Sequence, residues 1–446
     1  MRLDQLQKLL FAIAYLLMAS LSASKACTIA AVSGKATIDG RPLLLKNRDS
    51  LNKDIRIKIA KGCKYTYLCQ CIVPNGSALS GFNEAGFAIV NSHSYNLPNT
   101  DYDWNAHIMQ LALESCGSIT DFEQLLIQLP KPISVTANYG VMDAKGNVAI
   151  FETSAYTYTW YNVDDTPNGY LVRSNFSLSG DMFMINAKTP TSWPRYNTAI
   201  AYLEQMSQGL SLSKEHLFDL TRYLIADGGI NLYEQMPDDE NDETIVDFQN
   251  FIPRFKSTSA MVIQGIKNGE SPKNTIAWTM VGPPISTVTI PFWITPSKAL
   301  PSCVVPSADG HALLCRKGQL LKDSVFTDEK TVNLAWVYNQ SGTGIIQKTV
   351  QIESEILQKG DELTERIRQN SSAMEDISAF YSWVDSYVEN QYFIAYNEGE
   401  NAAISDGIRL LPGMDNAIND LLGRSNDNGD FRFGIRIKNG KKYIVK

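Results

Sequence analysis

The sequence predicts an α+β fold with mostly antiparallel sheets, because runs with strand character alternate with runs that have helical apolar spacing. The clearest strand signal is a hairpin, in which residues 139–143 and 148–153 flank a Lys145–Gly146–Asn147 turn. With 446 residues, of which 44% are hydrophobic and 20% charged, the chain is long and apolar enough for one large domain or two smaller ones.

The first half of the chain opens with strand patterns and continues with two helical ones. Residues 27–34 and 40–47 predict a hairpin, since Gly34–Lys35 and Asp39–Gly40 are turn signals. Pro130 and Pro132 end the second helical segment. We expect further strands at 55–60, 65–73 and 86–90, and helices at 104–115 and 119–129.

The second half continues the alternation and then becomes helical. Two segments with dense charge and helical periodicity, 353–369 and 373–392, predict a C-terminal helical region, followed by a short strand pattern at 431–437. Before that region we expect strands at 157–162, 170–174, 261–265, 277–281 and 286–292, and helices at 194–206 and 214–225.

Residues 1–26 have the order of a secretory signal. Arg2 and Lys8 accompany an apolar run at 9–21, and small residues follow at 22–26. The apolar run is shorter than the roughly 20 residues that span a bilayer. Cleavage after residue 26 would leave Cys27 first, so export to the periplasm or outside the cell is expected. A buried N-terminal helix and a lipidated Cys27 are less favoured alternatives; Lys25 stands where a lipoprotein signal has a small residue.

Cysteine usage and charge narrow the possible classes of function. The seven cysteines all follow residue 26, and an odd number in an exported chain leaves at least one free thiol. Cys303 with Cys315, and Cys63 with Cys69 or Cys71, are candidate disulfide pairs. No zinc-ribbon spacing or HExxH motif occurs, so no metal and no cofactor is expected. The net charge of −7, with no Lys/Arg-rich block, argues against a nucleic-acid partner.

A cysteine at the first position of a mature chain carries its own general base. A thiol with a pKa of about 8.5 is mostly protonated at neutral pH, whereas an α-amino group titrates near about 7.7–8.0 and is well populated in its neutral form. The amine of Cys27 would therefore accept the thiol proton and later deliver it to the leaving nitrogen of an amide. A disulfide-bonded or lipidated Cys27 is the structural alternative.

The segment from Cys27 to Asp49 resembles the start of the choloylglycine hydrolase and penicillin acyltransferase branch of N-terminal-nucleophile hydrolases. It is most similar to peptidase family C45, the linear amide C–N hydrolases. Lys46-Asn47-Arg48-Asp49 stands at the place of that family's Arg-Asn-x-Asp motif. The resemblance implies that Asp49 orients the α-amine. It also implies that Lys46 or Arg48 contacts the substrate; a Lys at the Arg position cannot make the same two-pronged contact.

Three later segments carry the same resemblance. Asn91 follows a turn similar to the family's Asn-Glu-x-Gly and is implied to be an oxyanion donor, as is Asn175. Arg195 lies in a segment that resembles the family's Ser-x-x-Arg helix start and completes the polar site. His93, close to Asn91, is expected at the rim of the site as a substrate contact, because the α-amine already serves as base.

The resemblance further implies a four-layer αββα sandwich over residues 27–345, with 346–446 as a helical extension packed on it. The expected substrate is a small linear amide, cleaved through a thioester on Cys27, and acyl transfer to another amine is an alternative outcome. A homo-oligomer is considered as well, and a stable membrane span is not expected. Two rival functions stay open: a dipeptidase of the related C69 group, and a non-enzymatic exported or lipidated binding protein.

Overall fold

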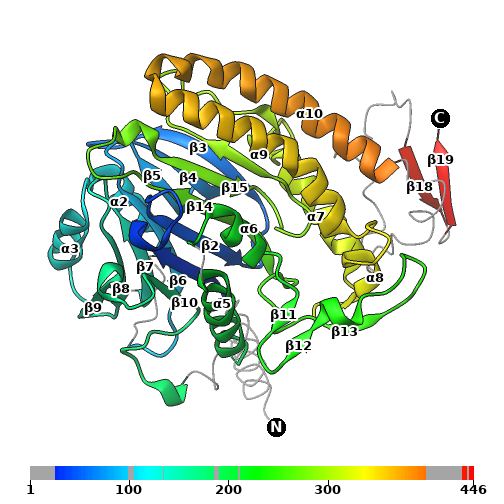
Figure 1. Cartoon of the computed structure of the whole chain (residues 1–446), viewed down its shortest axis with the longest axis horizontal. Coiled ribbons are helices and arrows are strands. Elements are labelled where there is room, and N and C mark those ends of the chain that lie inside the picture. Colours follow the sequence, from blue (N-terminus) through cyan, green and yellow to red (C-terminus); the bar gives the residue numbers. More distant parts are fainter. Residues whose placement is uncertain are drawn as a thin grey trace, which may run out of the picture.

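Two antiparallel β-sheets form the centre of the molecule (Figure 1). A computed structural model describes residues 26–98, 105–133, 135–184, 190–208, 211–397, 434–438 and 441–445. The expected secretory signal, apart from Ala26, lies outside the described residues. Within them, no helix is both long and apolar enough to cross a membrane.

The first sheet has six strands, and every neighbouring pair is antiparallel. Two of its strands, β1 (Thr28–Val32) and β2 (Leu43–Asp49), are buried along their whole length, because both faces of this sheet are covered. In spatial order the strands are β10 (Tyr170–Arg173), β1 (Thr28–Val32), β2 (Leu43–Asp49), β14 (Ser257–Gln264), β15 (Ile276–Met280) and β16 (Thr289–Phe292).

The second sheet is a seven-stranded meander whose spatial order follows the chain. Its last strand, β9, is at the edge of the sheet and has only intermediate and exposed residues. The strands are β3 (Ile55–Lys61), β4 (Thr66–Ile72), β5 (Ala78–Asn83), β6 (Ala88–His93), β7 (Ala137–Met142), β8 (Val148–Thr153) and β9 (Tyr158–Asn162).

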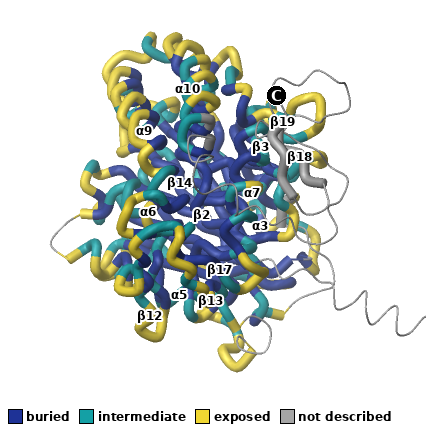
Figure 2. The backbone as a smooth tube through the Cα atoms, turned by 90° about the vertical axis from the view of Figure 1, so that its right-hand side faces the viewer, coloured by how far each residue is buried: buried dark blue, intermediate teal, exposed yellow. Residues whose placement is uncertain are grey.

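Helices cover the outer faces of both sheets and complete four layers, αββα. Helices α2 (Asn105–Ser115) and α3 (Ile119–Gln128) pack on the seven-stranded sheet, where Phe122 meets the rings of Tyr139 and Phe151. Against the six-stranded sheet lie α5 (Ser192–Ser207), α6 (Lys214–Leu220) and α9 (Ile345–Gln369), and α10 (Ile377–Asn397) lies beside α9. Figure 2 shows the sheets buried, and α9 and α10 with exposed outer sides.

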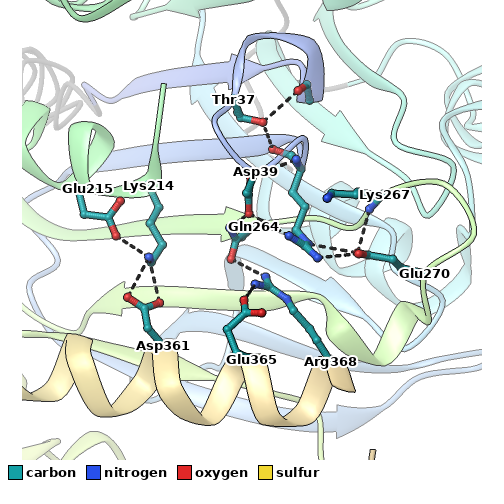
Figure 3. Close-up of polar contacts among 12 residues, drawn as sticks. Thr37, Asp39, Lys214, Glu215, Gln264, Lys267, Glu270, Asp361, Glu365 and Arg368 are labelled. Carbon is teal, nitrogen blue, oxygen red and sulfur yellow. Dashed lines mark hydrogen bonds and ion pairs between the residues drawn. The ribbon is translucent and has the colours of Figure 1, made fainter. Parts of the chain in front are cut away.

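Helix α9 is held to the core by polar contacts as well as by apolar packing. Asp361 of α9 forms an ion pair with Lys214 of α6, with 3.0 Å between the Asp361 carboxylate and Lys214 Nζ (Figure 3). Arg368 Nη2 donates a hydrogen bond to Gln264 Oε1, at the end of β14, at 2.9 Å. The C-terminal helices thus pack on the same core cluster as the six-stranded sheet. The division of the chain at residue 345 stays a prediction.

Short elements complete the described chain. They are α7 (Leu313–Val325), α8 (Leu334–Val337), the strand pairs β11 (Ile225–Ala226) with β12 (Ile230–Asn231), β13 (Ile245–Asp247) with β17 (Thr331–Asn333) and β18 (Gly434–Lys438) with β19 (Lys441–Val445), and the 3-10 turns Gly34–Ala36, Val163–Asp165, Met182–Met184, Leu232–Gln235, Pro272–Asn274, Ser302–Val304 and Ser371–Asp376.

The four-layer fold is confirmed, and several element boundaries differ. The helix expected over 214–225 ends at Leu220, because Gly228 and Gly229 have φ of 86° and 80° and form the turn of the β11–β12 hairpin. Helix α9 begins eight residues before the expected 353, α10 covers 377–397 instead of 373–392, and β16 starts at Thr289 instead of 286. Helix α7 was not expected.

The candidate disulfides are wrong. All seven cysteines are described, and each is a free thiol. Cys315 Sγ donates to the carbonyl of Lys53 at 3.2 Å, while Cys303 N donates to Asp385 of α10 at 2.9 Å, so the two are held by different neighbours. Cys69 and Cys71 are buried in β4, and Cys63 is exposed.

Candidate active site

Cys27 lies directly before β1, the second strand of the six-stranded sheet, and is 6% exposed. The antiparallel register pairs Thr28 with Asn47 and Ile29 with Lys46. Continued by one residue, this register sets Cys27 opposite Arg48, and partners across antiparallel strands share a face. Ile29 is on that face and lies near Gly140 of β7. The Cys27 side chain therefore belongs to the face that meets the second sheet.

Arg195 joins three of the expected site residues. It is in the first turn of α5 and is fully buried. Its Nη1 donates to the carbonyl of Cys27 and to Thr28 Oγ1, both at 2.9 Å, and its Nη2 donates to Asn175 Oδ1 at 2.8 Å. Burial, and after it the charge of Arg254, lowers the pKa of Arg195 to about 9, while Asp49 and Cys27 favour the charged form.

Asp49 ends β2, and its carboxylate is enclosed by donors. Arg254 Nε and Ser257 Oγ each donate to it at 2.7 Å, Asn47 Nδ2 donates at 3.1 Å, and Arg195 Nη1 lies 3.9 Å away. The ladder between β2 and β14 is irregular at Ser257. A bulge of this kind redirects a side chain beside a site, and here it accompanies the contact of Ser257 with Asp49.

Lys46 and Asn91 form a second contact, between the two sheets. Lys46 Nζ donates to the carbonyl of Leu79 at 2.7 Å and to Asn91 Oδ1. The β5–β6 ladder stops at Ser80 and Val90, so Lys46 reaches the point where the two strands separate. An amide oxygen held by an ammonium group leaves the Nδ2 group as the donor side. Lys46 is thus held by Asn91 and the carbonyl of Leu79, and the substrate contact that the resemblance implied for it stays a prediction.

Asn175 follows β10 and bridges the two sheets. Its Nδ2 donates to the carbonyl of His93 at 3.0 Å, while its Oδ1 accepts from Arg195. The ring of His93 is half-buried, and its centroid lies 4.8 Å from that of the Tyr95 ring, with the two planes tilted by 50°. His93 therefore lies beside Asn175 at the end of β6, and its main chain holds the Asn175 carboxamide.

Arg48 is the second buried guanidinium beside Cys27. Its Nη1 donates to Thr258 Oγ1 at 2.6 Å and to the carbonyl of Asn52 at 2.8 Å, both uncharged acceptors. Burial lowers the pKa of Arg48 to about 10, and Cys27 opposes that shift most strongly among its neighbours. A thiolate on Cys27 would be stabilised by this cation.

The structure therefore brings Cys27, Arg48, Asp49, Asn175 and Arg195 into one buried cluster, with Lys46 and Asn91 together between the sheets and His93 beside them. Three participants escaped the sequence reasoning. Arg254, Ser257 and Thr191, whose Oγ1 accepts from Arg254 Nη1 at 2.6 Å, match no motif of the resemblance. The only local signal in the sequence is one arginine before a strand, a pattern too common to identify a site residue.

Nothing in the cluster has the composition of a metal site. In the ranges that the structure describes, no three His, Cys, Asp or Glu side chains lie close enough together to hold an ion. What the cluster holds instead is a thiol, hydrogen-bond donors and guanidinium groups, which suit nucleophilic attack and the stabilisation of negative charge.

Solved structures with some similarity to this chain are described as an amidase, an acylase and a hydrolase. They include an N-acylethanolamine-hydrolyzing acid amidase orthologue from Caenorhabditis elegans (TM-score 0.34, 12% identity, 43% of this chain and 84% of that one). Penicillin V acylase from Agrobacterium tumefaciens (0.35, 16%, 61% and 87%) and a mutant conjugated bile acid hydrolase from Clostridium perfringens (0.37, 13%, 61% and 93%) also match. No curated protein sequence matches this chain.

One family model matches part of the chain. Residues 37–228 match the model described as acyl-coenzyme A:6-aminopenicillanic acid acyl-transferase. The matched region begins ten residues after Cys27 and includes β2 through β11, with Asp49, Asn91, Asn175 and Arg195. Over these residues, which are fewer than half of the chain, the sequence is similar to the acyl-coenzyme A:6-aminopenicillanic acid acyl-transferase family.

Proposed function

We propose that this chain is an exported cysteine amidase that cleaves a small linear amide through a thioester on Cys27. The observation that carries the proposal is the position of Arg195, which hydrogen-bonds Cys27 and Asn175 and lies 3.9 Å from Asp49. One buried side chain thus contacts the main-chain carbonyl of the proposed nucleophilic residue and the carboxamide oxygen of a proposed oxyanion donor, and it lies near the carboxylate proposed to orient the α-amine. Removal of residues 1–26 supplies that amine.

The α-amine of Cys27 is the proposed general base. It takes the thiol proton, directly or through one water, and Arg48 favours the resulting thiolate. The thiolate attacks the amide carbon, and a tetrahedral intermediate forms with its negative charge on oxygen. The protonated α-amine then gives its proton to the leaving nitrogen, and the C–N bond breaks to leave the acyl group on Cys27 Sγ.

The negative oxygen needs preorganised donors, and two carboxamides are held for that task. The Asn175 carboxamide is fixed by Arg195 and His93, and the Asn91 carboxamide by Lys46. A donor of this kind contributes about 3–4 kcal/mol to transition-state stabilisation in comparable sites. Water then attacks the thioester and regenerates the thiol. If an amine attacks instead, the product is a new amide, and the enzyme acts as an acyltransferase.

The test begins with the mature N-terminus. The full chain is expressed in an exporting host, and intact mass is measured with iodoacetamide labelling. A chain that starts with unmodified, alkylatable Cys27 supports the proposal. A diacylglyceryl group on Cys27, or cleavage elsewhere, contradicts it.

Activity on a panel of linear amides follows, with Cys27→Ala and Cys27→Ser as variants. We expect Cys27→Ala to lose all amide turnover and Cys27→Ser to keep a small fraction, because a hydroxyl is the weaker nucleophile. Cys63→Ala is the matched control, since Cys63 is an exposed free thiol. Turnover that survives Cys27→Ala would end the proposal.

A further inference from the structure

Arg48 is a buried cation on the same face of the first sheet as Cys27. The β1–β2 register, continued by one residue, sets the two residues opposite each other, and neighbouring strands are about 4.8 Å apart. Both side chains keep a small exposed fraction, 6% for Cys27 and 4% for Arg48. An acyl group on Cys27 Sγ would therefore lie within a few atoms of the Arg48 guanidinium.

The charge of Arg48 is not matched by an acidic partner. Its Nη1 donates to Thr258 Oγ1 and to the carbonyl of Asn52. Within the described part of the chain its Nε and Nη2 make no hydrogen bond, and no carboxylate forms an ion pair with it. Asp49 is the next residue of β2, but successive side chains of a strand point to opposite faces, and its carboxylate is held by the turn before β14. A buried cation without a carboxylate is costly, and an anionic ligand would offset that cost.

The side chains around Arg48 are polar and come from both sheets. Ser259 is opposite Arg48 in the β2–β14 ladder, and its Oγ donates to Gln70 Oε1 of β4 at 2.9 Å. Ser80 is opposite Gln70 in the β4–β5 ladder, and its buried Oγ has no hydrogen-bond partner among the described residues. Lys46, two residues before Arg48 and so on the same face of β2, adds a second buried cation. These surroundings suit a negatively charged group better than an alkyl chain.

The acyl part of the substrate is the part that would meet Arg48. In the proposed mechanism the leaving nitrogen takes its proton from the Cys27 α-amine, which Asp49 is proposed to orient, and Asp49 and Arg48 belong to opposite faces of β2. Before the attack, the Cys27 thiolate is itself an anion beside Arg48, whereas the thioester is neutral. A carboxylate on the acyl group would take the place of the lost thiolate charge.

From this geometry we propose that the site selects a substrate whose acyl group ends in a carboxylate, the monoamide of a short dicarboxylic acid, and that Arg48 binds this carboxylate. The inference rests on the proposed function and names the substrate class for it.

The experiment uses the mature chain starting at Cys27 and two p-nitroanilides: N-glutaryl-p-nitroaniline, and its analogue with a terminal carboxamide in place of the carboxylate. The two have nearly the same shape and differ in charge, and release of p-nitroaniline gives kcat/KM for each. We expect the unaltered chain to favour the glutaryl compound by about 10- to 100-fold, because the analogue loses a charge-assisted hydrogen bond. Equal kcat/KM values would overturn the inference.

Arg48→Met removes the charge and keeps an unbranched side chain, and we expect the ratio of the two kcat/KM values to fall close to one. A residue that only stabilises the thiolate would slow both anilides equally, so an unchanged ratio contradicts the binding role. Arg48→Lys keeps the charge, should keep a preference for the glutaryl compound, and serves if Arg48→Met does not fold. An Arg48→Lys chain without that preference would contradict binding through charge. Arg366→Met, which removes an exposed cation of α9, is the control and should leave the ratio unchanged.

The two proposals fail in different ways. Acetylation of Cys27 by p-nitrophenyl acetate, followed by intact mass, tests the nucleophile with an acyl group that has no carboxylate. If the unaltered chain is not acetylated on Cys27, the proposed function is wrong whatever Arg48 does. If Cys27 is acetylated and the glutaryl compound is cleaved no faster than its analogue, or not at all, the amidase proposal stands and the anionic substrate class is refuted.

Discussion

Two buried regions of this molecule use arginine and carboxylate groups in opposite ways. Where α9 meets the six-stranded sheet, Arg222 and Glu353 form a matched pair, with Nη1 and Nη2 donating to the two carboxylate oxygens at 2.8 and 2.7 Å. The main-chain N of Thr289 adds a third donor. Around Cys27, by contrast, the single carboxylate of Asp49 lies beside the guanidinium groups of Arg195 and Arg254, and a third buried guanidinium, that of Arg48, has only uncharged acceptors.

The difference appears in the pKa values. Burial opposes the charge of Arg222, but Glu353 overcomes it and the pKa of Arg222 is raised. Burial lowers the pKa of Arg195 and of Arg48, because one shared carboxylate does not balance them. A balanced pair holds a structure together. An excess of cations suits a site where negative charge develops on a thiolate and an oxyanion.

The largest effect on stability is expected at the balanced pair. Glu353→Gln leaves the buried charge of Arg222 without a partner carboxylate, and we expect the free energy of unfolding to fall by about 3–5 kcal/mol in urea titrations. Amide turnover per folded molecule should not change. Glu355→Gln on the exposed side of the same helix is the control, and an equal loss there would show that the pair is not special.

Next in size is a change in the unbalanced cluster. Arg195→Lys keeps a positive charge but cannot reach Cys27, Thr28 and Asn175 together, so we expect kcat/KM to fall about 100- to 1,000-fold. Unfolding should be less affected than in Glu353→Gln. A variant that unfolds easily yet retains its turnover would reverse the comparison and make Arg195 structural.

The smallest effect is expected at the rim of the α9 contact. Burial raises the pKa of Asp361, so its carboxyl group holds a proton more tightly in the folded state than in the unfolded state. The contribution of this group to stability is therefore lost as the pH rises through its folded pKa. Asp361 is about half exposed and paired with Lys214. Asp361→Asn should therefore change the unfolding free energy at neutral pH by less than about 1 kcal/mol. It should also remove that component of the pH dependence, measured by urea unfolding between pH 3 and pH 7; an unaltered pH profile would contradict this.

Much of the architecture follows from local patterns. The alternation over 139–143 and 148–153 predicted β7 and β8, and the turn signals after Cys27 predicted the β1–β2 hairpin that brings Asp49 near Cys27. The C-terminal helices were expected from periodicity, although α9 is longer at its start. The helix over 214–225 failed because apolar spacing continued into a segment where two glycines favour a turn.

The candidate site divides in the same way. Asn175 and Arg195 were expected to act together, and their side chains are hydrogen-bonded. The contact of Lys46 with Asn91 was not expected, because it depends on where β5 and β6 separate in the second sheet. Arg254 could not be found at all, since its neighbours in sequence have no pattern that distinguishes them.

By itself, the sequence determined which residue types are present and how the chain folds locally: the position of Cys27 before a strand, the hairpin, and the periodicity of each helix. Those features depend on neighbours within a few residues, which the pattern records. Only the tertiary structure decided that Arg254, Ser257 and Thr191 enclose Asp49 and the start of α5. Such contacts arise when two sheets and a helix pack, and the distance along the chain then carries no information about which side chains meet.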